Sequence, residues 1–199
     1  EIWGTGLMRY ESQLKVKPKK IHAVRGPLTR ESLIEQGYDC PEIYGDPALL
    51  YPRFYNPSIK KKYRLGIIPH YVDQKNSWLN KFRNRPDVKI IDILQYPTKV
   101  IDDIKSCDKI ISSALHGIIA ADSYGIPSKW IKLSDKVAGD GFKFRDYFAS
   151  VKRTDTGPIY IDSNISTIET MLISIEKQFT DYKIDIDLEK LLEVCPFKK

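Results

Sequence analysis

The segment that decides the fold class is Lys109-Ile-Ile-Ser-Ser-Ala-Leu-His-Gly-Ile-Ile-Ala120. The apolar run that ends at Ser112 is short enough to be a buried strand of a parallel sheet. From Leu115 onward the apolar spacing becomes helical, and we expect that helix to end before Gly125-Ile-Pro127. A buried strand that leads directly into a helix is typical of α/β proteins, in which helices connect parallel strands.

The same alternation of strand and helix patterns continues along the chain. Strands are expected at residues 21–25, 64–69, 88–91, 109–112 and 129–133, with a last short strand at 159–161. Helices are expected from Pro27 to Gly37, after Asp73 with Trp78, Leu79 and Phe82 on one face, around 100–104, and at 115–124 and 142–150. We therefore predict a Rossmann-like, doubly wound parallel sheet.

The last third of the chain has a purely helical pattern. Ser166-Thr-Ile-Glu169 is a capping box that predicts the start of a long helix. The buried face of that helix should carry four apolar residues at helical spacing: Ile168, Leu172, Ile175 and Phe179. Leu188, Leu191 and Leu192 predict a further tail helix.

Charge and cysteine content exclude several classes of protein. The net charge of +6 and the pI of about 9.0 weakly favour an anionic partner, but no nucleic-acid-reading motif accompanies the lysines. The three cysteines have no CxxC spacing, which fits a reducing cytoplasm better than a disulfide framework. Three scattered histidines predict no metal site. No apolar run approaches the roughly 20 residues that cross a bilayer.

Ligands of doubly wound sheets bind beyond the carboxyl ends of the strands. This rule selects Arg25-Gly26-Pro27, Pro69-His70-Tyr71 and Ser112–Gly117. A histidine in the first turn of a helix, as expected for His116, could bind a phosphate beside the free N–H groups or act as an acid. The alternative is that Ser113 caps the helix and His116 packs against its neighbours.

Three other side chains are weaker candidates for the same cleft. The planar fork of Arg25 suits a carboxylate or a phosphate, but an ion pair with Glu31 or Asp46 is the competing interpretation. Asp46, in a predicted tight turn, could orient Arg25 or a substrate hydroxyl, or only bond the backbone of its own turn. His70 follows the predicted strand at 64–69, and Asp73 is expected to cap the next helix.

Two further signals are set aside as structural. Gly4-Thr5-Gly6 lacks the third glycine and the preceding strand of a dinucleotide fingerprint. Asp185-Ile-Asp187 is similar to a paired-acid metal motif, but it precedes a tail helix and is interpreted as capping.

Six motifs together resemble the polysaccharide pyruvyl transferase family. In chain order they are Val24-Arg-Gly-Pro-Leu-Thr-Arg30, Gly45-Asp-Pro-Ala-Leu-Leu50, Ile68-Pro-His-Tyr-Val-Asp73, Ser112-Ser-Ala-Leu-His-Gly-Ile-Ile119, Asp122-Ser-Tyr-Gly-Ile-Pro127 and Lys143-Phe-Arg-Asp-Tyr-Phe148. The likeness covers roughly residues 1–150, and the combination is specific although each motif alone is weak.

The resemblance implies a fold like that of two-domain GT-B transferases, of which this chain looks like the C-terminal half. Residues 1–20 would then be the crossover segment between domains, 21–165 a Rossmann-like donor-binding domain, and 166–199 a helical tail. Trp3-Gly-Thr-Gly6 resembles the end of that crossover. The missing half would supply much of the acceptor site.

The resemblance also implies the reaction, which moves a pyruvyl group from phosphoenolpyruvate onto sugar hydroxyls of a bacterial surface or exopolysaccharide precursor. The product is usually a cyclic ketal, and phosphoenolpyruvate is the donor substrate, with no separate cofactor. The resemblance further implies a lipid-linked saccharide acceptor at the inner face of the cytoplasmic membrane, and exposed lysines permit peripheral contact there.

Site residues carried over from the family motifs are His116, which would contact phosphoenolpyruvate and donate the proton, and Arg25, which would hold the donor's phosphate or carboxylate. Leu115 would shape the pocket through its backbone, beside Ser113 and Gly117, and Asp46 and His70 would orient substrate or activate the acceptor. We expect His116 and Arg25 to meet at the edge of one sheet. Alternatives are a glycosyltransferase that uses a nucleotide sugar, with Trp130 and Asp135 at its donor, and a non-catalytic donor-binding fragment.

Overall fold

The computed structural model describes residues 1–154, 157–159 and 167–197. The chain forms two compact units, each built from segments that are separate in the sequence. The first unit contains Glu1–Tyr51, Ala138–Thr156 and Lys183–Lys199, and the second contains Pro52–Val137 and Gly157–Tyr182. The division at residues 20 and 165 that follows from the family resemblance stays a prediction.

The first unit is built on a two-stranded parallel sheet of β1 (Ile2–Thr5) and β2 (Ile21–Val24). Its helices are α1 (Pro27–Glu35), α4 (Phe142–Ser150) and α6 (Leu188–Glu193). Strand β1 was not predicted, because its sequence Ile-Trp-Gly-Thr is short and contains a glycine at a φ of 70°. Helix α6 is part of this unit because its residue Leu191 is completely buried and packs in one core cluster with Ala23 and Leu50.

The second unit contains a four-stranded parallel sheet in the order β4-β3-β5-β6. The strands are β3 (Tyr63–Ile68), β4 (Val88–Ile90), β5 (Cys107–Ser112) and β6 (Ser128–Trp130). The helices that connect and cover them are α2 (Pro97–Lys105), α3 (Leu115–Ser123) and α5 (Ile168–Glu176). The predicted mixed α/β class with parallel strands is confirmed, and this sheet is consistent with a Rossmann-like fold.

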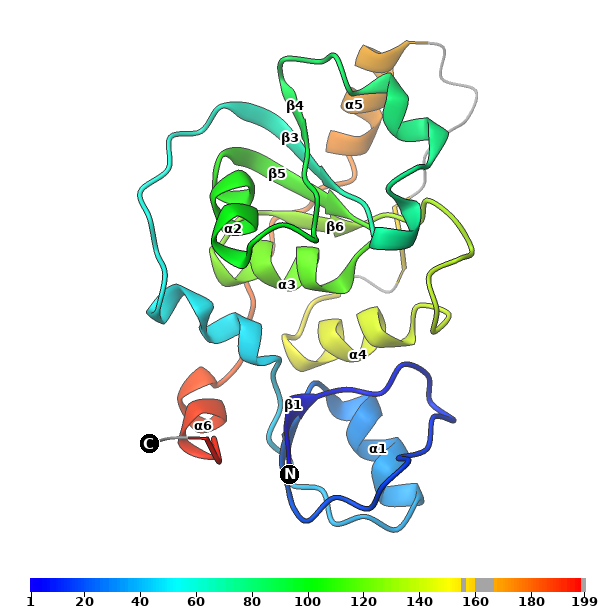
Figure 1. Ribbon diagram of the computed structural model, residues 1–199, viewed down its shortest axis with the longest axis vertical. Coiled ribbons are helices and arrows are strands. Elements are labelled where there is room, and N and C mark those ends of the chain that lie inside the picture. The colour runs from blue at the N-terminus through cyan, green and yellow to red at the C-terminus, as the bar shows by residue number, and fades with distance from the viewer. Residues whose placement is uncertain (155–156, 160–166, 198–199) are drawn as a thin grey trace. The chain divides into compact units, whose positions relative to one another are not determined.

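Alternate residues of the inner strands pack on opposite faces of this sheet, as the two-residue repeat of a strand requires. On one face Ile68 and Ile110 pack with the apolar side of α2 and α3, and on the other Ile67 and Ile111 pack with α5 (Figure 1). The predicted apolar face of α5 is confirmed for Leu172 and Ile175, which are buried there. Phe179 lies beyond the end of the helix, and it packs against the same core while only partly buried.

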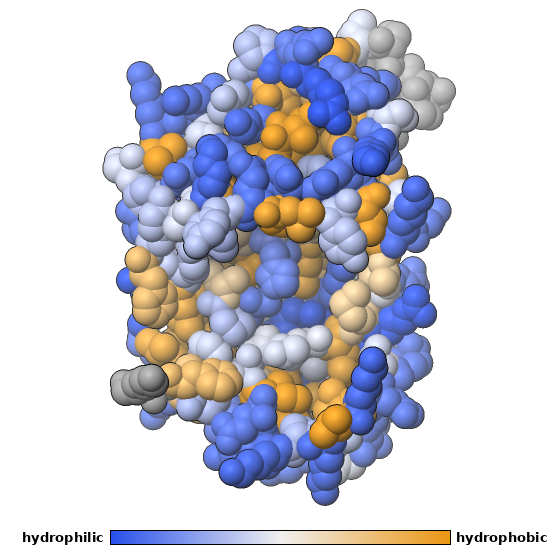
Figure 2. Space-filling model, in the orientation of Figure 1, coloured by the Kyte–Doolittle hydropathy of each residue, from blue (hydrophilic) through white to orange (hydrophobic). Residues whose placement is uncertain are grey.

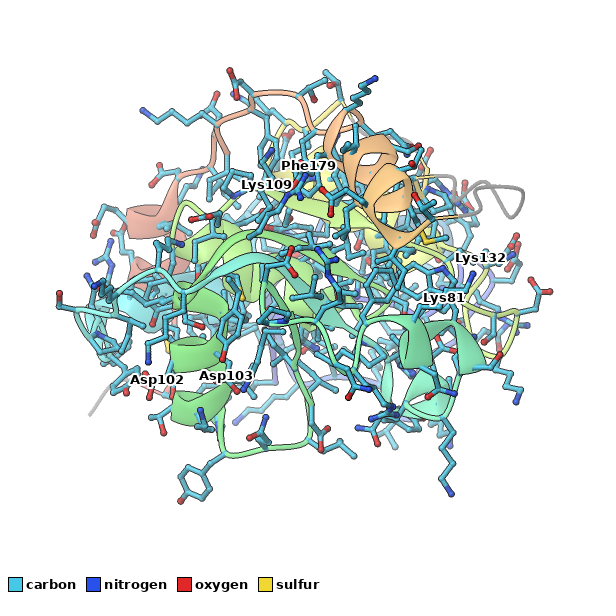
Figure 3. The ribbon with its side chains drawn as sticks, turned by 90° about the horizontal axis from the view of Figure 1, so that it is seen from above. Lys81, Asp102, Asp103, Lys109, Lys132 and Phe179 are labelled. Carbon is cyan, nitrogen blue, oxygen red and sulfur yellow. The ribbon has the colours of Figure 1, made fainter. Side chains whose placement is uncertain are left out.

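The segment after α5 also lies against the sheet. The ammonium of Lys109 on β5 lies 5.3 Å from the ring centroid of Phe179 (Figure 3). This cation–π contact joins the segment after α5 to strand β5.

Two local predictions are corrected by the structure. The helix expected after Asp73 is two short 3₁₀ helices, Tyr71–Asp73 and Ser77–Lys81, and Asn76 rather than Asp73 caps the second by accepting from Trp78 N at 2.9 Å. Helix α5 is capped by Thr167, whose hydroxyl accepts from Thr170 N at 3.2 Å. The predicted capping residue Ser166 and residues 160–161 of the last predicted strand lie outside the described residues. Ile159 itself forms a single parallel bridge with Ile131.

Within the part of the chain that the structure describes, no helix is long and apolar enough to cross a membrane. On the face drawn in Figure 2, hydrophilic residues surround separate groups of hydrophobic ones.

Candidate functional site

The turn between β5 and α3 carries the most informative motif of the sequence, and buried hydrogen bonds hold it. Ser112, the last residue of β5, is completely buried. Its hydroxyl accepts from Ala114 N at 3.0 Å and lies 2.9 Å from the carbonyl oxygen of Ile68 on the neighbouring strand. The geometry of this strand-to-helix turn is therefore fixed by β3 as well as by β5.

Ser113 joins this turn to the segment that follows β3. Its hydroxyl accepts from His70 N at 2.8 Å and donates to Asp73 Oδ2 at 2.9 Å. The other carboxylate oxygen of Asp73 accepts from the Ser134 hydroxyl. The interpretations of Ser113 and Asp73 as caps of the helices that follow them are therefore wrong. The predicted site residues Ser113 and His70 are brought together by this network.

His116 is the second residue of α3 and is exposed, whereas Leu115 before it is buried. Because α3 starts with Ala114 as an N-cap and has no side-chain cap, its first N–H groups are not bonded by a capping side chain. The partial positive charge of a helix N-terminus favours an anion beside such an imidazole. His116 is thus placed where a ligand from solvent can reach it.

Close packing accounts for the glycine at position 117, and its predicted contact with a substrate stays a prediction. A Cβ atom at this position would lie 2.4 Å from Ser112 Oγ and 3.1 Å from a methyl carbon of Ile68. The first turn of α3 can approach the strand ends only because residue 117 lacks a side chain.

Asp46 begins a tight turn, as predicted. Its Oδ1 accepts from Ala48 N at 3.0 Å, and its carbonyl oxygen accepts from Leu49 N at 3.0 Å. These bonds start the 3₁₀ helix Pro47–Arg53. The interpretation of Asp46 as a residue that bonds the backbone of its own turn is confirmed, and its role toward a substrate stays a prediction.

Arg25 follows β2 and is buried in the first unit. Its Nε donates to Asp146 Oδ2 at 2.9 Å, and its Nη2 donates to Leu7 O at 2.7 Å. The competing interpretation of Arg25 as part of an ion pair is therefore confirmed, but the acid is Asp146 on α4 rather than Glu31 or Asp46. The side chains of this pair are only 6% and 0% exposed.

Asp146 also caps helix α1, whose N-cap residue Gly26 has no side chain. Its Oδ1 accepts from Thr29 N at 2.9 Å, and its Oδ2 accepts from the Thr29 hydroxyl at 2.7 Å. A Cβ on Gly26 would lie 2.1 Å from the carbonyl oxygen of Asp146, so α4 can approach this closely only over a glycine. The sequence alone predicts no role for Asp146, although this residue lies in the Lys143–Phe148 motif.

Lys143, one turn before Asp146 on α4, is a second buried cation for which the sequence alone predicts no role. It is 6% exposed. Burial, and to a smaller extent the nearby charge of Arg25, lower the pKa of its ammonium. The signal that could have identified it is its place in the Lys143–Phe148 motif.

The two residues expected to form the centre of the site follow strands of different sheets. Arg25 follows β2 of the two-stranded sheet in the first unit, and His116 follows β5 of the four-stranded sheet in the second. The expectation that both lie at the edge of one sheet is therefore wrong. Their joint contact with one donor molecule stays a prediction.

Among residues 1–154, 157–159 and 167–197, no group of three or more histidine, cysteine, aspartate or glutamate side chains is arranged to hold a metal ion. Cys107 is buried, and burial raises the pKa of its thiol to about 11. This thiol is therefore protonated at neutral pH and donates to Asp103 O at 3.2 Å instead of serving as a nucleophile.

Comparison with known proteins decides the family. The model of the polysaccharide pyruvyl transferase family matches residues 6–134, which include Arg25, His70 and the Ser112–Gly117 segment. The chain belongs to this family. Lys143 and Asp146 lie beyond the matched range.

One curated relative is an uncharacterized protein, L143, of Acanthamoeba polyphaga mimivirus. It is 35% identical over 159 residues, which cover 74% of this chain and 53% of the relative. The chain thus spans about half the length of this relative. No solved structure gave a significant match.

We expect Asp146→Ala to destabilise the first unit strongly, because it leaves the buried guanidinium of Arg25 without its carboxylate and removes the cap of α1. Loss of one partner of a buried ion pair costs about 3–5 kcal/mol. Urea unfolding followed by circular dichroism measures the change. Arg145→Ala, at an exposed position of the same helix, should change stability by less than about 0.5 kcal/mol. Similar midpoints for the two variants would contradict the assignment.

Gly117→Ala should lower the free energy of unfolding by about 1–3 kcal/mol, because the new methyl group collides with Ser112. An alanine inside a helix otherwise stabilises it by up to about 1 kcal/mol relative to glycine. The control is Gly157→Ala, where the added Cβ meets no atom within 4 Å. An increase in the urea midpoint of Gly117→Ala shows that the turn is not closely packed.

Proposed function

We propose that this chain is the donor-binding part of an enzyme that transfers a pyruvyl group from phosphoenolpyruvate to saccharide hydroxyls and forms a ketal. The observation that carries the proposal is His116, an exposed imidazole at the start of α3 and beyond the end of β5, inside the segment that matches the family. A transferase family, an accessible proton donor and a helix N-terminus suited to an anion together fit this chemistry.

The reaction needs an acid, a nucleophile and charge compensation for the leaving group. Protonation of the enol methylene carbon creates a methyl group and a cationic carbon, which the first sugar hydroxyl attacks with loss of its proton. The oxygen of a second hydroxyl then bonds to the same carbon in place of the phosphate, which leaves with the C–O bonding electrons and takes up the proton of that hydroxyl. His116 supplies the proton in the first step, and the start of α3 stabilises negative charge beside it.

The other predicted site residues have supporting roles in this proposal. Ser113 holds the backbone of His70, whose ring lies 4.3 Å from the ring of Tyr71. In the proposal, His70 on this support activates the acceptor hydroxyl. Arg25 has two of its nitrogens engaged by Asp146 and Leu7, and its contribution to donor binding is therefore its positive charge and the third nitrogen, Nη1. Asp46 orients the segment that follows β2.

The fold proposed for the whole enzyme is of the two-domain GT-B type, with this chain as its second half. The length of the relative supports this, because the chain spans 53% of it. The remaining half would carry much of the acceptor site, so the isolated chain should bind donor and turn over slowly. A fragment that only binds donor is the corresponding non-catalytic alternative.

The alternative of a nucleotide-sugar glycosyltransferase receives less support from the structure. Trp130, the aromatic residue expected to stack on a nucleotide base, is only 8% exposed on β6. Asp135, the acid expected at the ribose, has a side chain that is 92% exposed and pairs with Lys132 at 2.6 Å. A buried ring presents little surface for stacking with a base.

Phosphoenolpyruvate should bind to the chain, and His116→Ala should weaken its affinity at least tenfold, about 1.4 kcal/mol. Isothermal titration calorimetry with phosphoenolpyruvate, UDP-glucose and GDP-mannose makes the measurement. Ser123→Ala, at the other end of α3, serves as the matched control and should bind as the wild type does. Unchanged affinity in His116→Ala removes the histidine from the mechanism, and tighter binding of a nucleotide sugar favours the glycosyltransferase.

The acceptor proposed here is a lipid-linked saccharide, and one exposed basic segment fits contact with an anionic membrane surface. Residues 15–20 contain four exposed lysines for which the described part of the chain supplies no ion-pair partner: Lys15, Lys17, Lys19 and Lys20. Val16 between them is 80% exposed and apolar. Each lysine near an anionic leaflet contributes about 1 kcal/mol of attraction.

Replacement of these four lysines by glutamine should abolish co-sedimentation with vesicles that contain phosphatidylglycerol, with no effect on phosphoenolpyruvate affinity. A control with the same change in net charge replaces four exposed lysines elsewhere: Lys60, Lys62, Lys75 and Lys81. Equal loss of vesicle binding in both variants, or equal binding of the wild type to phosphatidylcholine vesicles, argues against a specific membrane-contacting segment.

A further inference from the structure

A cavity of about 460 Å³ lies beside strand β4 in the second unit. Three cations line this cavity: Arg83, Arg85 and Lys89. Tyr63 belongs to the same wall, and Pro86 and Ile90 add apolar surface. Cavities of this size that combine apolar and aromatic surface with a few charged groups are typical binding sites of small molecules.

The cavity and the turn that carries His116 lie at different places on one sheet. Tyr63, the first residue of β3, is aligned with Cys107 at the start of β5, whereas His116 follows Ser112 at the end of β5. Strand β4 comes first in the order β4-β3-β5-β6, so on its outer side no strand of the described chain pairs with it. Such an edge strand presents free N–H and C=O groups, which can bind the hydroxyl groups of a ligand.

Arg85 is held in the wall of the cavity by two carboxylates. Its Nε donates to Asp87 Oδ1 at 2.8 Å, and its Nη2 donates to Asp87 Oδ2 at 2.8 Å. The same Nη2 also donates to Glu169 Oε2 at 3.0 Å. The charge of Arg85 is therefore compensated by the protein itself, and its guanidinium is a structural part of the wall.

The other two cations of the cavity are less compensated. Arg83 is exposed and donates from Nε to Asn80 Oδ1 at 3.0 Å, and its two terminal nitrogens have no acceptor in the part of the chain that the structure describes. Lys89 Nζ lies 3.7 Å from Asp103 Oδ1, but the same oxygen lies 2.7 Å from Lys99 Nζ, so one carboxylate serves two ammonium groups. Arg83 and Lys89 can therefore bind an anion that enters from solvent, since charge-assisted hydrogen bonds to a phosphate or carboxylate are strong.

The contact between Lys89 and Tyr63 connects the cationic side of the cavity to its aromatic side. Lys89 Nζ lies 5.6 Å from the centroid of the Tyr63 ring. A ligand whose anionic group binds Nζ therefore has the rest of its body beside this ring. The apolar C–H groups of a pyranose suit a surface of this kind, and its hydroxyl groups suit the free backbone of β4.

We propose that this cavity binds a monosaccharide unit that carries an anionic group, with Arg83 and Lys89 as the cations that hold the anion and Tyr63 as the surface beside the sugar ring. Phosphate and carboxylate share the chemistry that these two cations recognise. That the ligand is a saccharide rests on the proposed function, whereas the selectivity for an anion does not. A saccharide chain with an acidic unit bound here is held at a second point, away from His116.

Isothermal titration calorimetry of the full chain tests the ligand class with two acidic sugars, glucose 1-phosphate and glucuronate. The tighter of the two should bind at least tenfold more strongly than glucose, because the cations attract its anion, and at least tenfold more strongly than free phosphate or acetate, because the ring adds contact. Which acidic sugar is the tighter one distinguishes phosphate from carboxylate. Binding of neither acidic sugar, or equal binding of glucose or of the free anion, overturns the proposal.

Arg83→Gln and Lys89→Gln should each weaken the binding of the acidic sugar at least tenfold, about 1.4 kcal/mol. The matched control is Lys81→Gln, which removes an exposed cation at the end of the 3₁₀ helix Ser77–Lys81, outside the cavity, and should bind as the wild type does. Because Arg83 is exposed, its replacement keeps the proposal testable where Lys89→Gln does not fold. Unchanged affinity in Arg83→Gln, or an equal loss in Lys81→Gln, overturns the proposal.

Tyr63→Leu tests the aromatic side of the cavity. This variant should bind the acidic sugar only about as strongly as the free anion, because the ring no longer contacts the sugar. A difference between sugar and anion that stays as large as in the wild type contradicts the role of Tyr63. Circular dichroism checks the fold of the variant, since Tyr63 also packs against the buried cluster of Val100, Ile104 and Ile110.

The outcome is separable from that of the pyruvyl transfer proposal. Arg83→Gln should retain the phosphoenolpyruvate affinity of the wild type, and His116→Ala should retain the affinity for the acidic sugar. Binding of the acidic sugar that depends on Arg83, in a chain whose phosphoenolpyruvate affinity does not depend on His116, supports the cavity and contradicts the proposed function. Loss of both ligands in Arg83→Gln overturns the cavity as a separate site.

Discussion

The first unit depends on one carboxylate. Asp146 is completely buried, and it neutralises Arg25, caps the start of α1 and accepts the Thr29 hydroxyl. Arg25 and Asp146 are 121 positions apart in the chain, so this contact ties Glu1–Tyr51 to Ala138–Thr156, the segment that lies in the sequence between the two parts of the second unit. Desolvation of two charges is tolerated only when their hydrogen bonds are complete. Glycine at position 26 is part of the same constraint, because any side chain there would displace α4.

In the second unit, buried serine hydroxyl groups fix the turn at the carboxyl edge of the four-stranded sheet. Ser112 and Ser113 hold the turn before α3 to β3 and to Asp73, all within the buried interior. The exposed His116 is therefore presented from a turn whose own polar groups are satisfied. A functional side chain on such a support keeps its position when a ligand binds, which lowers the entropy cost of recognition.

Periodicity in the sequence was sufficient to predict helices and their buried faces. It could not predict which polar residues, distant from one another in the chain, are in contact. Helix α4 was predicted at its observed bounds of Phe142–Ser150, and two residues of the predicted face of α5, Leu172 and Ile175, are buried. Spacing alone could not show that Asp73 turns inward to Ser113, because an acid before a helix pattern is usually a cap. It also could not select Asp146 over Glu31 or Asp46 for Arg25, since only the tertiary fold decides which acid is near.

Arg25 shows how a charge that supports the fold is recognised in a buried cluster. Its guanidinium has fixed acceptors on two sides, Asp146 Oδ2 and Leu7 O, and its removal would leave a buried carboxylate without its cation. That carboxylate also caps α1, so a change at Arg25 acts on the start of the helix through Asp146. A buried cation of this kind is identified by the partners that its loss would leave unsatisfied, and these partners come from parts of the chain that sequence spacing cannot relate to one another.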